Sequence, residues 1–258
     1  MAYINFDSTR PFDVIPLGRI AIYFNPIDYF KPWKECSTFK KYVGGSPANI
    51  AVGLSRLGKK VGFIGCVSDD QMGDYCVSYF QKEGIDTSHI VRARNGESLG
   101  LAFTEILDKD TSGLIMYRDN VADLKLEPLD VEESYIKAAK ILIVSGTALS
   151  ESPSREAALK AMTYARKNGT VVVFDIDYRA YTWKNKDEIS IYYTAAAAMA
   201  DIIMGSREEY DLTDGLVYQG LDDISTAKRW FDENAKIVVI KHGKQGSAAY
   251  AMDGRSYS

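Results

Sequence analysis

Cysteine and histidine are scarce in this chain of 258 residues, which has three cysteines and two histidines. The cysteines, Cys36, Cys66 and Cys76, form no Cys-x-x-Cys pair, so the sequence favours a reduced, cytoplasmic protein over a disulfide framework or a zinc site. The histidines, His89 and His242, lie far apart and belong to no His-Glu-x-x-His motif. We therefore expect carboxylates, arginines and backbone groups, and not histidines, to carry any chemistry.

Long apolar runs and an excess of positive charge are also absent. Apolar runs such as 141–144 and 171–174 have the size of strands, and no run comes near the roughly 20 residues that a membrane span needs. We predict neither a membrane segment nor a signal peptide. The net charge of −4 and the pI near 5.4 argue against a nucleic-acid-binding surface.

Strand-like and helix-like segments alternate along the chain, and no linker divides it. The expected strands are 14–22, 61–67, 141–144, 171–175, 201–204 and 236–241. The expected helices are 47–57, 72–84, 154–168, 188–199, 206–212 and 222–234. This rhythm predicts a single α/β core over residues 1–258, with a central, mostly parallel sheet that helices cover on both faces. In such a sheet, ligands bind beyond the carboxyl ends of the strands.

Two stretches do not follow the alternation. Residues 99–107 and 114–117 form an expected hairpin, and the strand-like stretch 23–41 is rich in aromatic residues. We predict that strands from about 20–43 and 96–119 pair into a small β lid over the ligand-binding edge. The chain ends in a second expected hairpin, which turns at Asp253-Gly254.

A glycine pair opens the most informative motif, Gly44-Gly45-Ser46-Pro47-Ala48-Asn49. The glycines allow a sharp turn and a close approach to a ligand, while Ser46 and Pro47 are typical of a helix start. Asn49, one turn into that helix, offers an amide donor and an acceptor. We interpret the motif as a site for a polyhydroxylated ligand; the alternative is a loop that only turns the chain.

Two arginines are candidates for binding an acidic group. Arg179 follows an apolar strand in Asp175-Ile176-Asp177-Tyr178-Arg179 and can hold a carboxylate or phosphate with two hydrogen bonds. Arg118 lies at the end of the expected lid. The alternative for Arg179 is a solvated loop after the strand, and the alternative for Arg118 is a surface salt bridge.

Two later segments also follow strands. Ser206-Arg207-Glu208-Glu209 begins a helix, and its capping residues explain most of the pattern. The turn Lys241-His242-Gly243-Lys244-Gln245-Gly246 contains two glycines along which a nucleotide can lie. It is not a Walker A loop, because the chain has no Gly-x-x-x-x-Gly-Lys-Ser/Thr motif.

These residues together resemble the ribokinase-like (PfkB) carbohydrate kinases along essentially the whole chain. The first signature of that family is matched by Gly44, Gly45, Asn49, Ala51, Leu57 and Gly58. In that family, the glycines and the asparagine of the signature bind the sugar. Within the family, the chain is most similar to the kinases that act on 5-dehydro-2-deoxy-D-gluconate in inositol catabolism. The resemblance implies a ribokinase-like fold and transfer of phosphate from ATP to a primary hydroxyl of a sugar acid.

The resemblance also assigns the remaining residues. Arg118 and Arg179 fall where related sugar-acid kinases bind the acid end of the substrate. Glu209 falls on the glutamate of an Asn-x-x-Glu motif that organises Mg²⁺ and phosphate, with Ser206 at the asparagine position. The positions that match the strand and turn beside the adenine nucleotide are Lys241, Gly243 and Gly246.

Besides Ser206 at the asparagine position, the chain departs from the family at two further points. Tyr23 stands where the family usually has an aspartate that binds sugar hydroxyls, so it is the substrate-side residue at that position. The family's Gly-Ala-Gly-Asp loop, whose aspartate is the general base, does not occur in the sequence. We expect that loop beyond Ser258, in a part of the protein that this C-terminally incomplete chain lacks.

The alternatives within the family are a 2-keto-3-deoxygluconate kinase and a fructokinase, which the two arginines disfavour. A nucleoside kinase would use Tyr117 or Phe103 for stacking on a base. A module that binds a sugar acid or a nucleotide without catalysis is the alternative from another class. The resemblance also allows a homodimer that forms through the lid.

Overall fold

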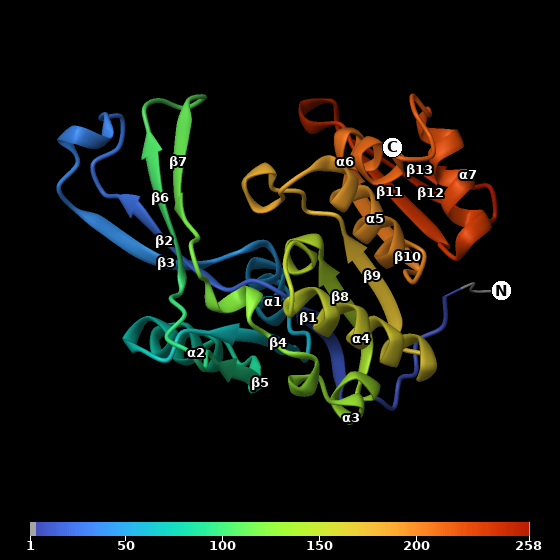
Figure 1. Ribbon diagram of the computed structural model, residues 1–258, viewed down its shortest axis with the longest axis horizontal. Helices are drawn as coiled ribbons and strands as arrows, with labels where there is room; N and C mark the ends of the chain where they lie inside the picture. The colour runs from blue at the N-terminus through green and yellow to red at the C-terminus, as the bar shows by residue number, and fades with distance from the viewer. Residues whose placement is uncertain (1–3, 258) are drawn as a thin grey trace.

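The computed structural model describes residues 4–257 and contains a large and a small sheet (Figure 1). The strands of the large sheet are β1 (Phe12–Leu17), β4 (Gly62–Val67), β5 (Asp86–Arg92), β8 (Ala139–Ser145), β9 (Val171–Asp175), β10 (Ile202–Ser206), β11 (Ile237–Lys241), β12 (Ser247–Ala251) and β13 (Ser256–Tyr257). Their order is β13-β12-β11-β10-β9-β8-β1-β4-β5. Only the pairs β11-β12 and β12-β13 are antiparallel; the other neighbours are parallel. The predicted α/β fold with a mostly parallel sheet is confirmed.

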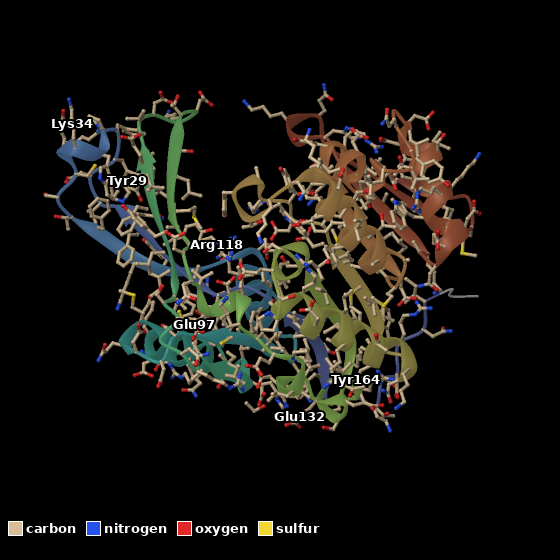
Figure 2. All side chains as sticks on the ribbon, viewed as in Figure 1. Tyr29, Lys34, Glu97, Arg118, Glu132 and Tyr164 are labelled. Atoms are coloured by element: carbon tan, nitrogen blue, oxygen red, sulfur yellow. The ribbon has the colours of Figure 1, made fainter. Side chains whose placement is uncertain are left out.

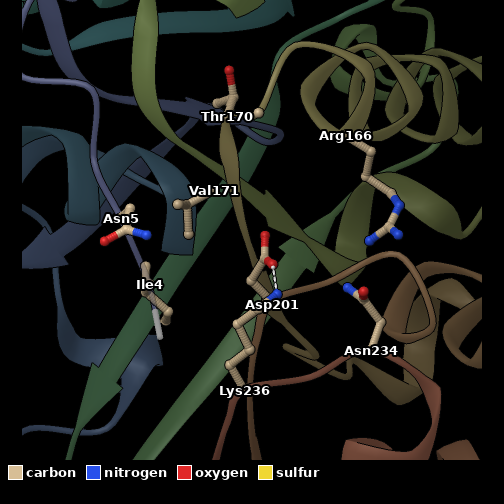
Figure 3. A pocket seen from close by; sticks show the side chains of 9 residues that line it. Ile4, Asn5, Arg166, Thr170, Val171, Asp201, Asn234 and Lys236 are labelled. Atoms are coloured by element: carbon tan, nitrogen blue, oxygen red, sulfur yellow. Dashed lines mark hydrogen bonds and ion pairs between the residues drawn. The ribbon is translucent and has the colours of Figure 1, made fainter. Parts of the chain in front are cut away.

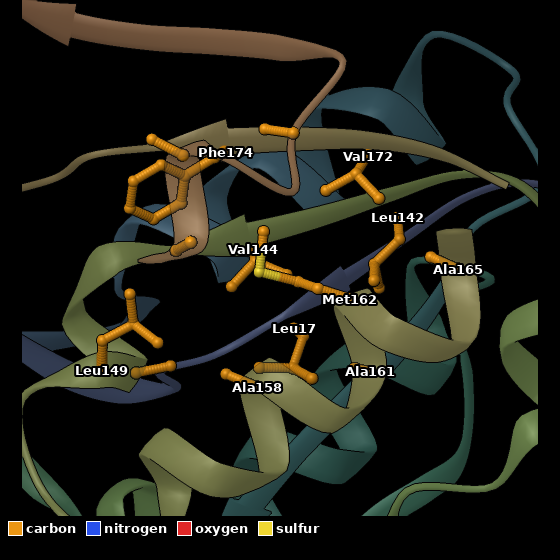
Figure 4. Packing of buried hydrophobic residues seen from close by; sticks show 14 of the residues in the cluster. Leu17, Leu142, Val144, Leu149, Ala158, Ala161, Met162, Ala165, Val172 and Phe174 are labelled. Carbon is orange, nitrogen blue, oxygen red and sulfur yellow. The ribbon is translucent and has the colours of Figure 1, made fainter. Parts of the chain in front are cut away.

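The helices are α1 (Ser46–Arg56), α2 (Gln71–Lys82), α3 (Glu133–Lys137), α4 (Ser154–Lys167), α5 (Lys186–Ala197), α6 (Arg207–Asp214) and α7 (Asp223–Glu233). The small side chains of α4 let it lie close to the large sheet. Ala158, Ala161 and Met162 of this helix are buried against strand residues that include Leu142 and Val144 (Figure 4). None of the helices in residues 4–257 is long and apolar enough to cross a membrane.

The small sheet stands beside the large one, at the left of Figure 1. Its strands are β2 (Ala21–Pro26), β3 (Phe39–Gly44), β6 (Gly100–Ile106) and β7 (Ser112–Tyr117), in the order β3-β2-β6-β7. They come from the two stretches from which we predicted a lid. An aromatic cluster holds the sheet to its loops: Phe24 stacks on Phe103 with ring centroids 4.9 Å apart, and Trp33 packs on Phe39 at 4.6 Å. Such pairs add stability beyond their buried area.

The predicted strand 14–22 is wrong, because the structure divides it between the two sheets. Gly18 has a φ of +146°, a conformation that residues with a Cβ rarely adopt. The chain leaves β1 of the large sheet at this glycine and enters β2 of the small sheet at Ala21. The edge strand β5 was not predicted, since its sequence begins with the polar run 86–89.

Candidate functional site

The two edges of the large sheet differ in what they offer a ligand. A polar pocket of about 280 Å³ lies at the amino ends of β9, β10 and β11 (Figure 3). Its charged groups already have partners: Lys236 Nζ lies 2.6 Å from Asp201 Oδ1, and Arg166 donates to the Met199 carbonyl at 3.2 Å. These contacts tie the strand starts together. The predicted site residues instead follow the carboxyl ends of strands, where parallel sheets bind ligands.

The space next to Gly44 and Gly45 is filled by other parts of the chain. A Cβ on Gly44 would lie 2.3 Å from Cδ2 of Tyr23, and a Cβ on Gly45 would lie 2.6 Å from the carbonyl oxygen of Arg19. Gly45 also has a φ of +106°. The glycines are therefore required by packing inside the protein, whatever they also do for a ligand.

The start of α1 joins the glycine pair to the end of β9. Gly45, and not Ser46 as predicted, is the N-cap residue. Ser46 Oγ instead donates to Asp175 Oδ2 at 3.2 Å, which draws this hydroxyl away from the helix. Asn49 is exposed on the first turn of α1. The structure thus brings the motif with the glycine pair and the carboxyl end of β9 together.

Asp175 lies near two other carboxylates at this edge. Burial raises the pKa of Asp175, and the nearby Asp177 and Glu209 carboxylates add to that rise. Lys241 acts in the opposite direction, since its Nζ lies 3.5 Å from Asp175 Oδ1. Lys241, the predicted nucleotide-side lysine at the end of β11, therefore faces the carboxylate at the end of β9.

Glu209 is fixed at both of its oxygens. Oε2 accepts a hydrogen bond from the Ser206 N–H at 2.6 Å, and Oε1 accepts one from the Tyr178 N–H at 2.8 Å. Ser206 Oγ accepts from the Glu209 N–H in return, which completes a capping box. The carboxylate holds the start of α6 against the loop that follows β9, and each of its oxygens keeps a lone pair for a further partner.

The two predicted arginines both have carboxylate partners. Arg118 donates to both oxygens of Asp123, at 3.1 and 2.7 Å, and lies where the small sheet meets the rest of the protein (Figure 2). Only 7% of the Arg118 side chain and 2% of the Asp123 side chain are exposed. Arg179 Nη2 lies 2.7 Å from Asp177 Oδ1, and its side chain is 40% exposed. Arg179 is the more accessible of the two.

The turn after β11 is open. A Cβ on Gly243 or Gly246 would meet no atom within 4 Å, and both residues have positive φ. His242 in the same turn lies with Nε2 2.8 Å from Asp223 Oδ2 of α7. The backbone of this turn is therefore open at both glycines.

A buried cation was missed by the sequence analysis. Arg19, in the segment that joins β1 to β2, is 2% exposed. Its Nη1 donates to the hydroxyl of Tyr181 at 3.2 Å, and its Nε has no hydrogen-bond partner among residues 4–257. Its position directly after Gly18, at the end of an apolar strand, was the one available signal.

Residues 4–257 contain no group of three or more His, Cys, Asp or Glu side chains placed to hold a metal ion. Mg²⁺, however, is commonly held by one or two carboxylates together with water and phosphate oxygens. Asp175 ends β9, and Glu209 lies in the first turn of α6, directly after the neighbouring strand β10. These two carboxylates are the residues that could hold a cation of that kind together with a phosphorylated ligand.

Known proteins resemble the chain in sequence and in fold. A profile of the pfkB family carbohydrate kinases matches residues 12–257. A protein from Clostridium perfringens named 5-dehydro-2-deoxygluconokinase is 62% identical over 257 residues, which make up 100% of this chain and 76% of that protein. The solved structure of a PfkB protein from Polaromonas sp. JS666 has a TM-score of 0.85 at 27% identity, over 95% of this chain and 81% of that one. A solved structure from E. coli, in complex with ATP and Mg²⁺, has a TM-score of 0.81 at 25% identity, over 95% of this chain and 77% of that one.

Proposed function

The chain belongs to the pfkB family of carbohydrate kinases, and from that premise we propose that it transfers the γ-phosphoryl group of ATP to the primary hydroxyl of 5-dehydro-2-deoxy-D-gluconate. The observation that carries the proposed substrate is the 62% identity to the Clostridium perfringens 5-dehydro-2-deoxygluconokinase over the whole chain. The use of ATP is supported by the bound nucleotide in the E. coli structure.

The proposed sugar side of the site consists of Gly44, Gly45, Asn49 and Tyr23. Asn49 offers an exposed amide for the hydroxyl groups of the substrate. Tyr23 lies against Gly44, so its phenol group has a fixed place beside the glycine pair. The uncharged tyrosine hydroxyl donates one hydrogen bond, whereas the charged carboxylate of an aspartate would accept two. We therefore expect a lower affinity for the sugar than with an aspartate at this position.

Arg118 and Arg179 are the arginines that the family resemblance assigns to the acid end of the substrate. Both already have a carboxylate partner in the protein. Arg179 is exposed enough to exchange Asp177 for a substrate carboxylate. Arg118 is held by two hydrogen bonds to Asp123 and therefore contributes shape more than free charge.

The proposed nucleotide side of the site consists of Ser206, Glu209, Lys241, Gly243 and Gly246. Phosphoryl transfer asks the protein for positioning and for neutralisation of charge more than for covalent chemistry. Lys241 brings a positive charge to the edge where the phosphates would lie, and Glu209 is held rigidly by two backbone N–H groups. A Mg²⁺ ion held through Glu209 and Asp175 would neutralise phosphate oxygens when it is bound.

The small sheet is the proposed lid and the proposed surface of a homodimer. Its strands expose apolar side chains on both faces: Ile115 and Tyr117 share one face, and Tyr42 and Leu114 lie on the other. Exposed apolar side chains such as the pair on β7 are typical of a protein contact. Light scattering after size exclusion tests it: a dimer that Ile115→Lys converts to a monomer supports the proposal, and a monomeric parent protein contradicts it.

A coupled assay of ADP release tests the proposed reaction. The acceptors are 5-dehydro-2-deoxygluconate, 2-keto-3-deoxygluconate, fructose and adenosine. Because the sequence has no Gly-x-Gly-Asp motif, the assay compares this chain with a chimera that adds the segment of the Clostridium perfringens relative outside the match. We expect the chimera to turn over the first acceptor preferentially and Glu209→Gln in the chimera to abolish turnover.

Each alternative predicts a different result in the same assay. Preference for another acceptor would replace the proposed substrate by 2-keto-3-deoxygluconate, fructose or adenosine. A chimera that binds the sugar acid and ATP but releases no ADP would show a binding module without catalysis.

A further inference from the structure

Arg19 carries a buried positive charge that no carboxylate contacts directly in the described part of the chain. It is 2% exposed, and within residues 4–257 its side chain makes one hydrogen bond, to the hydroxyl of Tyr181 at 3.2 Å. Among the same residues, nothing pairs with its buried Nε atom. An arginine that is buried without an anion costs free energy, so proteins pair or use such groups.

The carboxylate that acts on Arg19 already has a partner. Asp123 lies close enough to act on Arg19 electrostatically, yet both of its oxygens accept hydrogen bonds from Arg118. Burial works to lower the pKa of Arg19, but Tyr181 and Asp123 outweigh it and leave that pKa raised. Arg19 is therefore cationic, and the group of Arg19, Arg118 and Asp123 has one positive charge in excess.

This excess charge lies among the loops of the proposed sugar site. The backbone of Arg19 supports Gly45, whose Cβ would lie 2.6 Å from the Arg19 carbonyl oxygen and 3.6 Å from the Arg19 Cγ. Tyr181 belongs to the loop after β9, which also contains Arg179. The guanidinium thus reaches from the glycine pair to the loop after β9.

We propose that Arg19 binds the carboxylate of the sugar-acid substrate together with Arg179 and so helps to select acids over neutral sugars. The inference rests on the proposed function and adds a residue to it. A carboxylate supplies the anion that Arg19 lacks and accepts two parallel hydrogen bonds from its guanidinium. Tyr181, which is 51% exposed, covers the guanidinium until the substrate arrives.

Calorimetric binding to the chain, without any need for turnover, tests the assignment. The probes are 5-dehydro-2-deoxygluconate and its carboxamide, which keeps the size and removes the charge. We expect Arg19→Met to weaken binding of the acid about 10- to 100-fold and to leave binding of the carboxamide unchanged. Arg56→Met is the matched control, since it removes an equal charge from an exposed ion pair with Glu83 and should change neither affinity.

Thermal unfolding without ligand separates substrate binding from a structural role. Because Arg19 lacks a direct anionic partner in the free protein, Arg19→Met should have a melting temperature equal to or above that of the parent chain. A saturating amount of the sugar acid should raise the melting temperature of the parent chain and not that of the variant.

The outcomes are distinct. A parent chain that binds neither probe contradicts the proposed function itself. The role of Arg19 alone is overturned if the parent chain prefers the acid and the Arg19→Met variant keeps this preference. It is also overturned if the variant has a lower melting temperature than the parent chain. If Arg19→Met does not fold, Arg19→Gln, which can still bond to Tyr181, decides by the same comparison: loss of the preference supports the assignment and its retention overturns it.

Discussion

Removal of the Asp123 charge is the sharpest test of how the arginines are arranged. In the structure this carboxylate accepts two hydrogen bonds from Arg118 and faces Arg19 electrostatically. Asp123→Asn keeps the shape of the side chain and removes the charge. Two buried guanidinium groups would then lack the anion that compensates them, which is far costlier than the loss of a surface pair.

The expected loss can be estimated from the burial of the pair. Breaking a buried ion pair by removal of one partner costs about 3–5 kcal/mol. For a domain of this size, each kcal/mol lowers the melting temperature by about 2 °C, so we expect a decrease of about 6–10 °C. Replacement of both partners by apolar residues, in Arg118→Met/Asp123→Leu, should restore part of the lost stability, because the Arg118 charge is then no longer left alone, whereas Arg19 still lacks the Asp123 charge.

Urea unfolding monitored by circular dichroism measures both variants and the single variant Arg118→Met. The double-mutant cycle should give a favourable coupling energy between the two residues of about 2 kcal/mol or more. A loss of less than about 1 kcal/mol in Asp123→Asn would refute the reasoning, since it would show that water or another group already compensates the arginines.

Two further predictions concern packing and thiol reactivity. Gly45→Ala should destabilise the protein by about 1–3 kcal/mol in urea unfolding, because Gly45 has a φ of +106° and the new Cβ would meet the Arg19 carbonyl. In contrast, a Cβ on Gly53 in α1 would meet no described atom within 4 Å, so Gly53→Ala should stabilise the protein by about 0.5–1 kcal/mol. Equal effects of the two substitutions would contradict the packing argument. Burial raises the pKa of Cys66 and of Cys76 to about 12, so at pH ~8 a thiol reagent should label Cys36 alone in the folded chain, and rapid labelling of more than one thiol would contradict this.

The alternation of strands and helices was predictable because it depends on local patterns. The strand 171–175 and the helix that starts at Ser154 were read directly from an apolar run and from helical spacing. The break at Gly18 was not, since apolar residues continue on both sides of it and the run looks like one strand. Only the φ of +146° at Gly18 reveals that the chain changes sheets there.

The common position of some candidate residues was predictable, and their pairing was not. Glu209 and Lys241 lie just after or at the ends of β10 and β11, so the fold class places them on the same side of the large sheet. The contact between Arg19 and Tyr181 joins residues 162 positions apart, which no local pattern predicts. The pairing of Arg118 with Asp123 depends on the turn after β7, where Asn120 has a φ of +44°.

The phosphorylated product tests the central claim most directly. The measurement is ³¹P NMR of 5-dehydro-2-deoxygluconate after incubation with ATP, Mg²⁺ and the chimera that adds the remaining segment of the Clostridium perfringens relative. We predict a monophosphate ester on the primary hydroxyl of the sugar acid, formed in equal amount to ADP. ATP that is left intact, or a phosphate ester that forms on fructose in preference to the sugar acid, would contradict the account.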